Sequence, residues 1–546
     1  MPTPFERPIT EPPALHWKPE IWRPKSPKLS SLRSSARRSF QQASAQFLRA
    51  LAQIAELSDL QLPLPPTANP NPDSTPLLLT GHQPVIFHPG LVFKYQLTQA
   101  VAASHHCTAA ALVIDTDEGD PGVFEVPRPA TLNSSLTRLA PPAQLPVPAL
   151  RRTLSTFSAG PGLYAACRLA PRSRRSEVTA DVLQALRSAE CLAAATAFSE
   201  TAAHYARLPD DLPMTAANTL IRRAAGIGSG MAEVPLTTVC GLPEVLRFFS
   251  DLLATAPAFH QTYNTVLTDW RQQQGIRNDA NPFPNLRSAP NALELPFWLV
   301  DPRKGTRAVA WLHTPASPSS HSPSIGNEYQ TVAELPHGFE AETLLSLQLA
   351  GQLLVPRGAL ITATLRLLFS DLFIHGLGGG HYDPATDELI RRWWQESPPP
   401  FAVASASMCL FPVERTAVRQ LLEFRSHYRD LQFNPGRYLD QPVFSGAHAA
   451  EIRGLLEQKQ KAVEELAQHR ATGTSGRETG RRLQQLSDAI RTQVTRILQP
   501  HREAIDNLSE ETVSTVESRT WPWFFFPGDW DLTTRGCVIA TSPKFA

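Results

Sequence analysis

The sequence predicts an α/β protein with a mostly parallel sheet at its core, added helices and a C-terminal antiparallel helical hairpin that resembles a coiled coil. Two short apolar runs flank a stretch with helical spacing between residues 77 and 114. Two longer stretches with apolar stripes at helical spacing flank a turn near residue 475. A chain of 546 residues is long enough to bury a large core around such elements.

The composition excludes some classes of binding partner and some cellular locations for the protein. The chain has 51 Lys and Arg against 50 Asp and Glu, and this balance argues against binding to nucleic acid or anionic lipid. No apolar run reaches the ~20 residues that span a bilayer, and the first residues, MPTPFERPITEPPALHW, contain no signal-peptide core. The six cysteines are scattered without a CxxC pair, which indicates reduced thiols. We therefore expect a cytoplasmic protein that binds neither nucleic acid nor membrane.

Residues 1–75 are predicted to form an N-terminal helical arm and a linker. Ser34 to Leu57 carries apolar residues at helical spacing, which predicts an amphipathic helix. The following LPLPPTANPNPDSTP is too rich in proline to be helical. This segment marks the boundary with the core.

The core, residues 76–440, begins with a predicted βαβ unit. Leu77 to Thr80 reads as a strand, GHQPVIFHPG as a loop, Leu91 to Ser104 as a helix, and Ala110 to Ile114 as a second strand. Further helices are expected over Ser176 to His204, Leu242 to Gln274 and Gly358 to Ile374. His313 to Ile325 is expected to be a polar loop, either a lid or simply mobile. The loops after the first two strands should meet at the carboxyl edge of the sheet, where open α/β sheets bind ligands.

The C-terminal part is predicted to be a helical hairpin over residues 446–515. Apolar stripes on both sides of ATGTSGRETG indicate two helices joined by a reversal. Each arm is short, so we expect it to pack on the body or on a second copy of the chain, which would make a homodimer. Residues 516–546 contain WPWFFFP, and this aromatic tail is expected to dock on the core.

The loop after the first strand is the first candidate site. Its glycines permit unusual backbone angles, and its prolines stiffen the chain between them. Lys94 is placed in the first turn of the next helix, where a positive charge opposes the helix dipole and a bound phosphate or carboxylate would resolve the conflict. The alternative is a surface lysine beside histidines that cap turns. The ligand-binding candidates here are Gly81, His82, Gln83, His88, Gly90 and Lys94.

The acidic segment DTDEGD follows the second strand. At least one of Asp115 and Asp117 should face the same cleft as His82. Such a pair can hold a divalent metal, bind sugar hydroxyls or act as a general base. The alternative is a solvated acidic turn.

The segment HGLGGGHYD is the third candidate. Asp371 and His375 are four residues apart, so they share a helix face if the helix runs that far, and the carboxylate could then orient the imidazole. The glycines that follow would form a loop whose backbone approaches a ligand closely, although helix capping explains one or two of them. Arg357 and Arg366 could clamp an anion or form structural ion pairs. The ligand-binding candidates here are Gly378, Gly379, Gly380, His381 and Asp383.

The same histidines and aspartates could in principle hold a metal ion. No pair among them has the close spacing of a zinc motif such as H-E-x-x-H, so no metal ligand is assigned. The chain also contains no Walker A loop, no G-x-G-x-x-G fingerprint and no G-x-S-x-G elbow.

The segment LLLTGHQPVIFHPGLVFKYQLTQAV resembles the T-G-Q-Q-P…G-P-L…K segment of the cysteine-adding enzymes of bacillithiol synthesis, and DTDEGDPGVFEV resembles their E-D-H-D-F-x-E cluster. The resemblance covers residues 77–126, with matches at Gly81, Gln83, Pro84, Gly90, Lys94, Asp115 and Asp117. It implies a Rossmann-like core, a coiled coil that mediates dimerisation, and a ligase that joins cysteine to a glucosamine–malate conjugate with nucleotide activation. His82 replaces the first glutamine of the family motif, and the histidine of E-D-H-D has no counterpart here.

Two functions remain open at this point. The first is a ligase or group-transfer enzyme for a small phosphorylated or nucleotide-activated metabolite, with ATP or ADP and Mg²⁺ as the cofactor that the resemblance allows. Its catalytic candidates are His82, Asp115, Asp117 and His375. The second is a noncatalytic ligand-binding or assembly protein that keeps the fold. The first requires the catalytic candidates and Lys94 to face one cleft.

Overall fold

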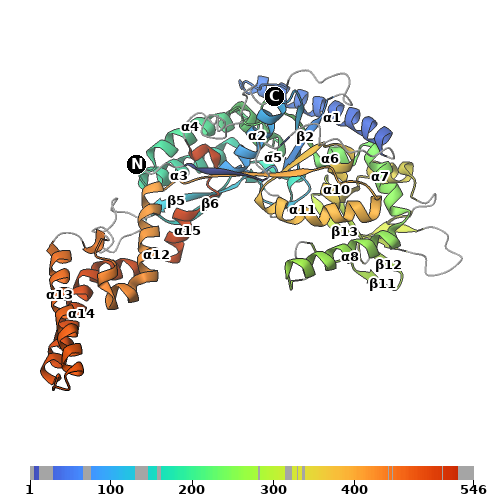
Figure 1. Cartoon of the computed structure of the whole chain (residues 1–546). Helices are drawn as coiled ribbons and strands as arrows, with labels where there is room; N and C mark the ends of the chain where they lie inside the picture. Colours follow the sequence, from blue (N-terminus) through green and yellow to red (C-terminus); the bar gives the residue numbers. More distant parts are fainter. Residues whose placement is uncertain are drawn as a thin grey trace.

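The computed structural model shows a mixed α/β protein built around a six-stranded sheet (Figure 1). It describes residues 5–11, 17, 29–65, 75–129, 146–156, 162–278, 280, 283–313, 323–328, 330–334, 339–440, 442–444, 447–506 and 508–526. The strands of the main sheet, in spatial order, are β1 (Phe5–Glu11), β18 (Phe401–Met408), β17 (Leu372–His375), β2 (Leu77–His82), β3 (Thr108–Val113) and β10 (Ala232–Pro235). Only β1 is antiparallel to its neighbour; the other pairs are parallel.

The central strands of the main sheet are buried on both faces, which explains why β2, β3 and β17 are mostly apolar. Alternate residues of a strand point to opposite faces. Leu78 and Ile374 belong to one hydrophobic cluster, whereas Leu79 and Phe373 belong to another. The first cluster includes α2 (Pro89–Ser104) and α5 (Met214–Ala224). The second includes α6 (Leu236–Cys240), α7 (Pro243–Leu253) and α10 (Ala359–Leu368).

The segment between β3 and β10 adds small strands and helices to the α2 face. These elements are β4 (Glu118–Gly119), β5 (Val123–Pro129), β6 (Pro146–Thr153), β7 (Ser155–Thr156), β8 (Gly162–Leu163), β9 (Arg168–Leu169), α3 (Arg172–Ser188) and α4 (Leu192–Arg207). The single helix expected over Ser176 to His204 is therefore two helices. Glu190 between them has a positive φ, which reverses the chain.

A second, antiparallel sheet is inserted between β10 and β17. Its strands are β11 (Ser288–Ala289), β12 (Ala292–Asp301), β13 (Thr306–His313), β14 (Ser324–Gly326), β15 (Thr331–Glu334) and β16 (Leu353–Pro356). Helices α8 (Ala256–Gln274) and α9 (Ala341–Leu349) belong to the same insertion. The helix expected over Leu242 to Gln274 is divided into α7 and α8. Of the polar loop expected over His313 to Ile325, residues 314–322 lie outside the described part of the chain.

The helix expected over Gly358 to Ile374 is wrong in its second half. Helix α10 ends at Leu368, and β17 begins at Leu372. Asp371 between them accepts a hydrogen bond from the backbone N–H of Leu77 and pairs with Arg33 and Arg37 of α1 (Ser30–Leu57). These bonds fix the start of β17 beside β2.

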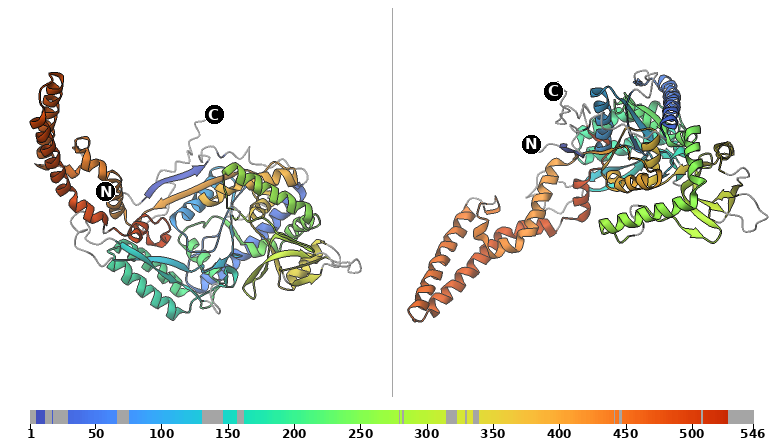
Figure 2. Two further views of the ribbon diagram at one scale, coloured as in Figure 1. Left: turned by 90° about the horizontal axis from the view of Figure 1, so that it is seen from below. Right: turned by 45° about the vertical axis from the view of Figure 1, so that its right-hand side comes forward.

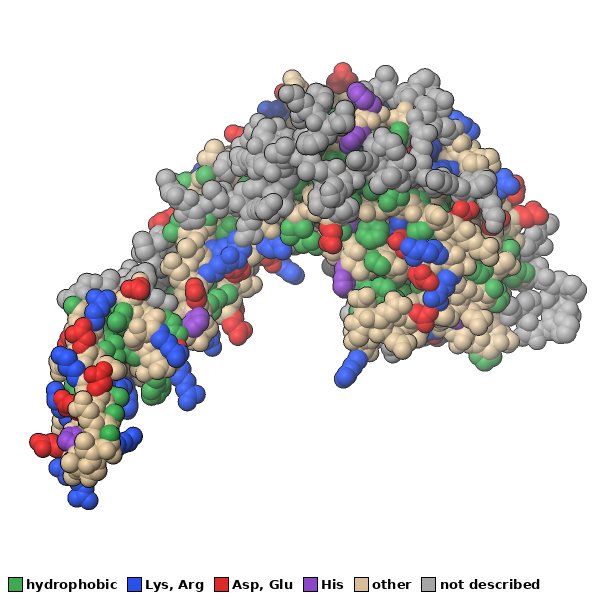
Figure 3. Space-filling view, viewed as in Figure 1, with side chains coloured by type: hydrophobic (Ala, Val, Ile, Leu, Met, Phe, Trp, Pro, Cys, Tyr) green, Lys and Arg blue, Asp and Glu red, His purple; other side chains and the backbone are tan. Residues whose placement is uncertain are grey.

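The C-terminal helices extend away from the core (Figures 1 and 2). They are α12 (Pro412–Phe433), α13 (Ala447–Ala471) and α14 (Arg477–Asp506), whereas α15 (Glu510–Glu517) lies against the core, where its Val516 is buried. Ile452, Ile490 and Val494 form a small hydrophobic cluster with residues of α12. Acidic and basic side chains are interspersed on the outside of α13 and α14 (Figure 3). No helix in the described ranges is long and apolar enough to cross a membrane.

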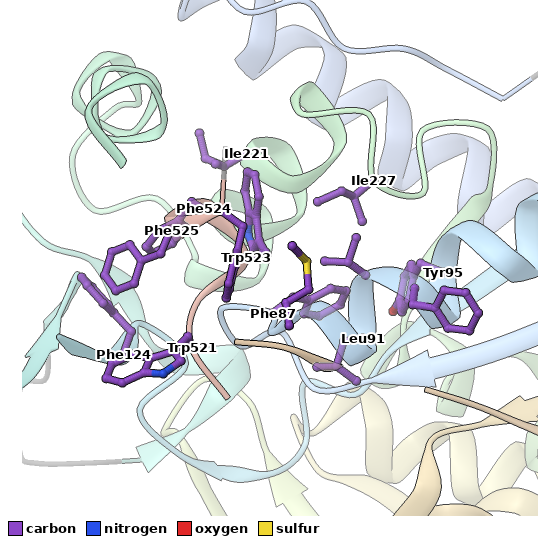
Figure 4. Close-up of a cluster of buried hydrophobic side chains, with 14 of the residues drawn as sticks. Phe87, Leu91, Tyr95, Phe124, Ile221, Ile227, Trp521, Trp523, Phe524 and Phe525 are labelled. Carbon is purple, nitrogen blue, oxygen red and sulfur yellow. The ribbon is translucent and has the colours of Figure 1, made fainter. Parts of the chain in front are cut away.

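The aromatic segment after α15 returns to the core. Trp521, Trp523, Phe524 and Phe525 are buried in the same hydrophobic cluster as Phe124 and α2 (Figure 4). The backbone N–H of Trp523 donates to the carbonyl of Phe87, 2.8 Å away, in the loop after β2. The end of the described chain thus covers the loop that the sequence singles out.

Candidate ligand site at the carboxyl edge of the sheet

The connections that follow β2 and β17, two neighbouring strands, lead to opposite sides of the sheet. From β2 the chain passes through α2 to β3 on one side, and from β17 it passes through α11 (Leu377–Leu389) to β18 on the other. This is the switch point at which open α/β sheets leave a crevice outside the carboxyl ends of their strands. Ile374 pairs with Thr80, so His375 lies beside Gly81 at this crevice.

Lys94 reaches the crevice from the α2 face. Its Nζ donates to the carbonyl oxygen of Gly81 at 2.8 Å. The next carbonyl, that of His82, accepts from the N–H of Ile114 on the β3 side. Because successive strand carbonyls point in opposite directions, the Gly81 carbonyl points toward β17. The ammonium group therefore lies at the gap between β2 and β17.

The position of Lys94 in its helix differs from the expectation. It is the sixth residue of α2, not part of the first turn, so the helix dipole does not govern it. The side chain is 2% exposed and makes no ion pair with a carboxylate of the described residues. Burial lowers the pKa of Lys94 to about 7. A buried positive charge without a counter-ion is what an anionic ligand would compensate.

His82 and His88 are close to this charge and are held by local contacts. His82 packs edge-on against Phe87, and burial together with the Lys94 charge lowers its pKa to about 3. The Nδ1 atom of His88 accepts from the N–H of Gly90 and caps α2, and burial and Lys94 lower its pKa to about 4. Both rings are therefore neutral near pH 7. The loop closes over them, leaving beside His82 a cavity of about 10 Å³.

Gly81 and Gly90 serve close packing rather than unusual backbone angles, because neither has a positive φ. A Cβ on Gly90 would lie 2.9 Å from both the carbonyl oxygen of Ala406 and the Oγ of Ser405. A Cβ on Gly81 would lie 3.3 Å from the Cβ of Leu112. Gly90 thus lets α2 approach β18, and Gly81 lets β2 approach β3.

His375 lies on the opposite face and pairs with a residue that differs from the expected one. Its Nε2 is 2.9 Å from Oδ2 of Asp383, whereas Asp371 is committed to the arginines of α1. The expectation that Asp371 and His375 share a helix face is wrong, because His375 ends strand β17. An ionised Asp383 only accepts hydrogen bonds, so Nε2 carries the proton and Nδ1 of the neutral ring has the lone pair.

Arg366 forms a buried ion pair with Asp383 and holds its carboxylate in place. The two side chains are almost fully buried and form an ion pair at 2.7 Å, and Arg366 also pairs with Asp387 at 2.6 Å. Burial alone would raise the pKa of Asp383, but His375 and Arg366 outweigh it and hold the pKa below its usual value. Arg366 is therefore a structural partner and no anion clamp. Arg357 likewise pairs with Glu294.

The glycine cluster is the first turn of α11 and not a loop. None of its glycines has a positive φ. A Cβ on Gly379 would lie 2.6 Å from Nδ1 of His375, and one on Gly380 would lie 2.1 Å from a methyl group of Val403. A Cβ on Gly378 would meet nothing within 4 Å. Two glycines thus permit close packing, and Gly378 leaves the first turn of α11 open.

Asp115 and Asp117 have separate partners. Asp115 accepts from the backbone N–H and the hydroxyl of Thr237 at 3.0 and 2.6 Å, and burial, which these bonds oppose, raises its pKa to about 6. Asp117 accepts from Gln83 at 2.7 Å and from Arg307 of the second sheet at 2.9 Å. Both carboxylates connect elements around the carboxyl edge.

His381 points away from these groups. It is exposed on α11, and its ring lies 6.0 Å from that of Trp270 and 5.0 Å from that of Tyr382. Of the predicted residues, the structure brings Lys94, Gly81 and His375 to the crevice. His82 and His375 lie on opposite faces of the sheet, so the candidates do not share a single cleft. Among the described residues, no three His, Cys, Asp or Glu side chains gather in a way that could hold a metal ion.

Sequence reasoning missed Arg307 and Thr237, because both belong to elements far along the chain. Arg307 lies 4.5 Å above the Trp298 ring and joins the second sheet to Thr116 and Asp117 in the loop after β3. No local pattern in the sequence indicates this contact. No protein-family model matches the chain, and no curated protein matches it.

Proposed function

We propose that this protein is a ligase or group-transfer enzyme that binds a small phosphorylated or nucleotide-activated metabolite at the crevice between β2 and β17. The observation that carries the proposal is the buried ammonium group of Lys94, which lies at the switch point without a carboxylate partner in the described chain. An anion there would supply the missing negative charge.

The strand order supports the same location. Numbered from β2 along the chain, the order β10-β3-β2-β17-β18 is 3-2-1-4-5, as in Rossmann-like sheets. The first turn of α11 supplies backbone N–H groups at the same edge, with open space beside Gly378. A phosphate between this turn and Lys94 would be bound from both sides.

His375 is the group best placed for proton transfer. Asp383 fixes its tautomer and leaves the Nδ1 lone pair free to accept a proton from an attacking amine, thiol or hydroxyl. Asp117 and Gln83 form a pair that could hold polar groups of the acceptor, and Asp115 joins the end of β3 to Thr237 of α6. A nucleotide such as ATP or ADP would bind with Mg²⁺ coordinated mainly by its own phosphates.

The closed loop sets a condition on binding. Lys94 is 2% exposed, and the segment Trp521–Phe526 covers the loop after β2. A ligand therefore reaches Nζ only when residues 82–88 move.

The alternative function, a noncatalytic ligand-binding protein, is favoured by the location of His82 and His375 on opposite faces of the sheet. We also propose a homodimer through α13 and α14, in keeping with the family resemblance.

The proposal is tested by a thermal-shift screen with ATP, ADP, AMP, sugar phosphates, cysteine and glucosamine–malate, each with and without Mg²⁺. Saturable stabilisation by a phosphate-containing ligand is expected for the wild type and not for Lys94→Met. Lys461→Met, an exposed lysine of α13, is the matched control and should respond like the wild type. Equal stabilisation of Lys94→Met would contradict the proposal.

A further inference from the structure

A second cavity lies at the other end of the main sheet. It has a volume of about 580 Å³ and lies beside the first residues of β3 and β10, between α1 and the C-terminal end of α2. Small-molecule sites typically enclose roughly 300–1,000 Å³. The candidate site described above is at the carboxyl edge, so the two regions are separated by the length of the strands.

The described lining of this cavity is mainly apolar. Leu48, Leu64, Ala102 and Ala109 are among the residues that surround it. Such a surface favours an aliphatic or aromatic ligand body, because each buried methylene contributes about 0.8 kcal/mol in transfer from water. A highly polar ligand such as a nucleotide would leave its hydroxyl and phosphate groups without partners here.

The polar groups of the lining favour an acidic ligand over a basic one. Arg49 of α1 is the only lining residue, among those described, that carries a permanent charge. Its Nε donates to the carbonyl of Ala45, and its guanidinium forms no ion pair with a described carboxylate. Gln99 uses its Oε1 to accept from the N–H of Gly230, which leaves its Nε2 as a donor. Arginine and an amide donor recognise a carboxylate.

We propose that this cavity binds a monomeric carboxylic acid with an extended apolar body, such as a medium-chain fatty acid. The apolar body lies among the leucine and alanine side chains, and the carboxylate lies at the rim beside Arg49. The inference is independent of the proposed enzymatic function, because no residue of the crevice lines this cavity.

The experiment uses the full chain and a dansyl-labelled undecanoic acid as a fluorescent probe, with unlabelled decanoic acid as competitor. Saturable fluorescence enhancement that decanoic acid reverses is expected. Ala45→Trp places a large ring in the cavity from an exposed position of α1 and should weaken probe binding about tenfold or more. Ala50→Trp, also exposed on α1 but outside the lining, is the matched control and should leave binding unchanged.

The role of the charge is tested separately. Arg49→Gln should weaken decanoic acid competition about threefold, because the guanidinium is exposed, and should leave competition by decanol unchanged. Absence of saturable binding, or equal binding by wild type and Ala45→Trp, would overturn the cavity as the site. Equal effects of Arg49→Gln on the acid and the alcohol would overturn the assignment of the ligand as a carboxylate.

Discussion

At the scale of single residues, Lys94 is the feature that most needs a functional explanation. Its ammonium group is buried, bonded to one carbonyl oxygen and surrounded by neutral histidines. Burial of an uncompensated charge destabilises the folded state, and perturbed groups of this kind cluster at functional sites. The sequence marks Lys94 as a candidate because of a conflict with the helix dipole, and this reason is wrong because Lys94 lies beyond the first turn of α2. The burial of Lys94 cannot be predicted from the local sequence, because it results from the packing of α2 on β2.

Replacing Lys94 by methionine should stabilise the protein at pH 7 by roughly 2–4 kcal/mol, because the lysine pKa falls from about 10.4 in the unfolded chain to about 7 in the folded chain. Between these two values the unfolded chain binds one more proton, so the stability of the wild type should rise with pH over this window. Urea denaturation from pH 6.5 to 10 checks this, and Lys94→Met should lack the rise. A variant less stable than the wild type at pH 7 would contradict the uncompensated charge.

Asp383→Asn should destabilise the protein by about 3–5 kcal/mol at pH 7, because it removes a charge from the buried pair with Arg366. Asp383 has a lowered pKa in the folded chain, so its contribution is present above the unfolded value of about 3.9 and disappears as the pH falls through the folded value. Denaturation at pH 7 and pH 3 measures both effects. The difference between wild type and variant should shrink at pH 3; an undiminished difference would show that the carboxylate charge is not the cause.

At the scale of elements, local sequence patterns predict the strand–helix–strand unit closely. They fail where contacts between residues far apart in the chain determine the secondary structure. Leu77 to Thr80 and Leu91 to Ser104 lie within β2 and α2. The run from Gly358 to Ile374 looks like one apolar helix, yet the arginines of α1 and the start of β2 bind Asp371 and force a strand after it. The glycine cluster looks like a loop, but Gly379 and Gly380 leave room for His375 and Val403, contacts that no local pattern shows.

The glycines of α11 offer a matched pair of substitutions. Gly380→Ala should destabilise the protein by about 1–3 kcal/mol, because its Cβ would clash with Val403. Gly378→Ala should instead stabilise it by about 0.5–1 kcal/mol, since alanine is the better helix former and nothing lies within 4 Å. Melting temperatures of the two variants check the packing. If Gly378→Ala also weakens binding of a phosphate ligand while raising stability, the open first turn is part of the site.

At the scale of the whole molecule, the C-terminal aromatic segment joins distant parts of the chain. Phe524 and Phe525 pack against Phe124 (Figure 4). They also pack against Phe198, and the N–H of Trp523 donates to the loop after β2. The composition of WPWFFFP predicts burial, but not the surface that buries it. The second sheet and its Arg307 contact likewise depend on strands paired across long distances in the sequence.

Phe524→Ala should destabilise the core by about 3–5 kcal/mol, because it leaves a cavity among four aromatic side chains. Chemical denaturation measures the change. Phe433→Ala, at an exposed position of α12, is the control and should change stability little. Similar behaviour of both variants would mean that the aromatic segment does not pack on the core.

The central claim, an anion bound at Lys94, is tested most directly by proton uptake on ligand binding. Isothermal titration of the best phosphate ligand from the thermal-shift screen is performed at pH 8 in buffers of different ionisation enthalpy. At this pH a lysine with a pKa of about 7 is mostly neutral, and a bound anion raises that pKa. We predict the uptake of close to one proton per ligand by the wild type, and no saturable binding heat with Lys94→Met, in agreement with the thermal-shift prediction. Binding of the same ligand without proton uptake, or with equal uptake by Lys94→Met, would contradict the claim.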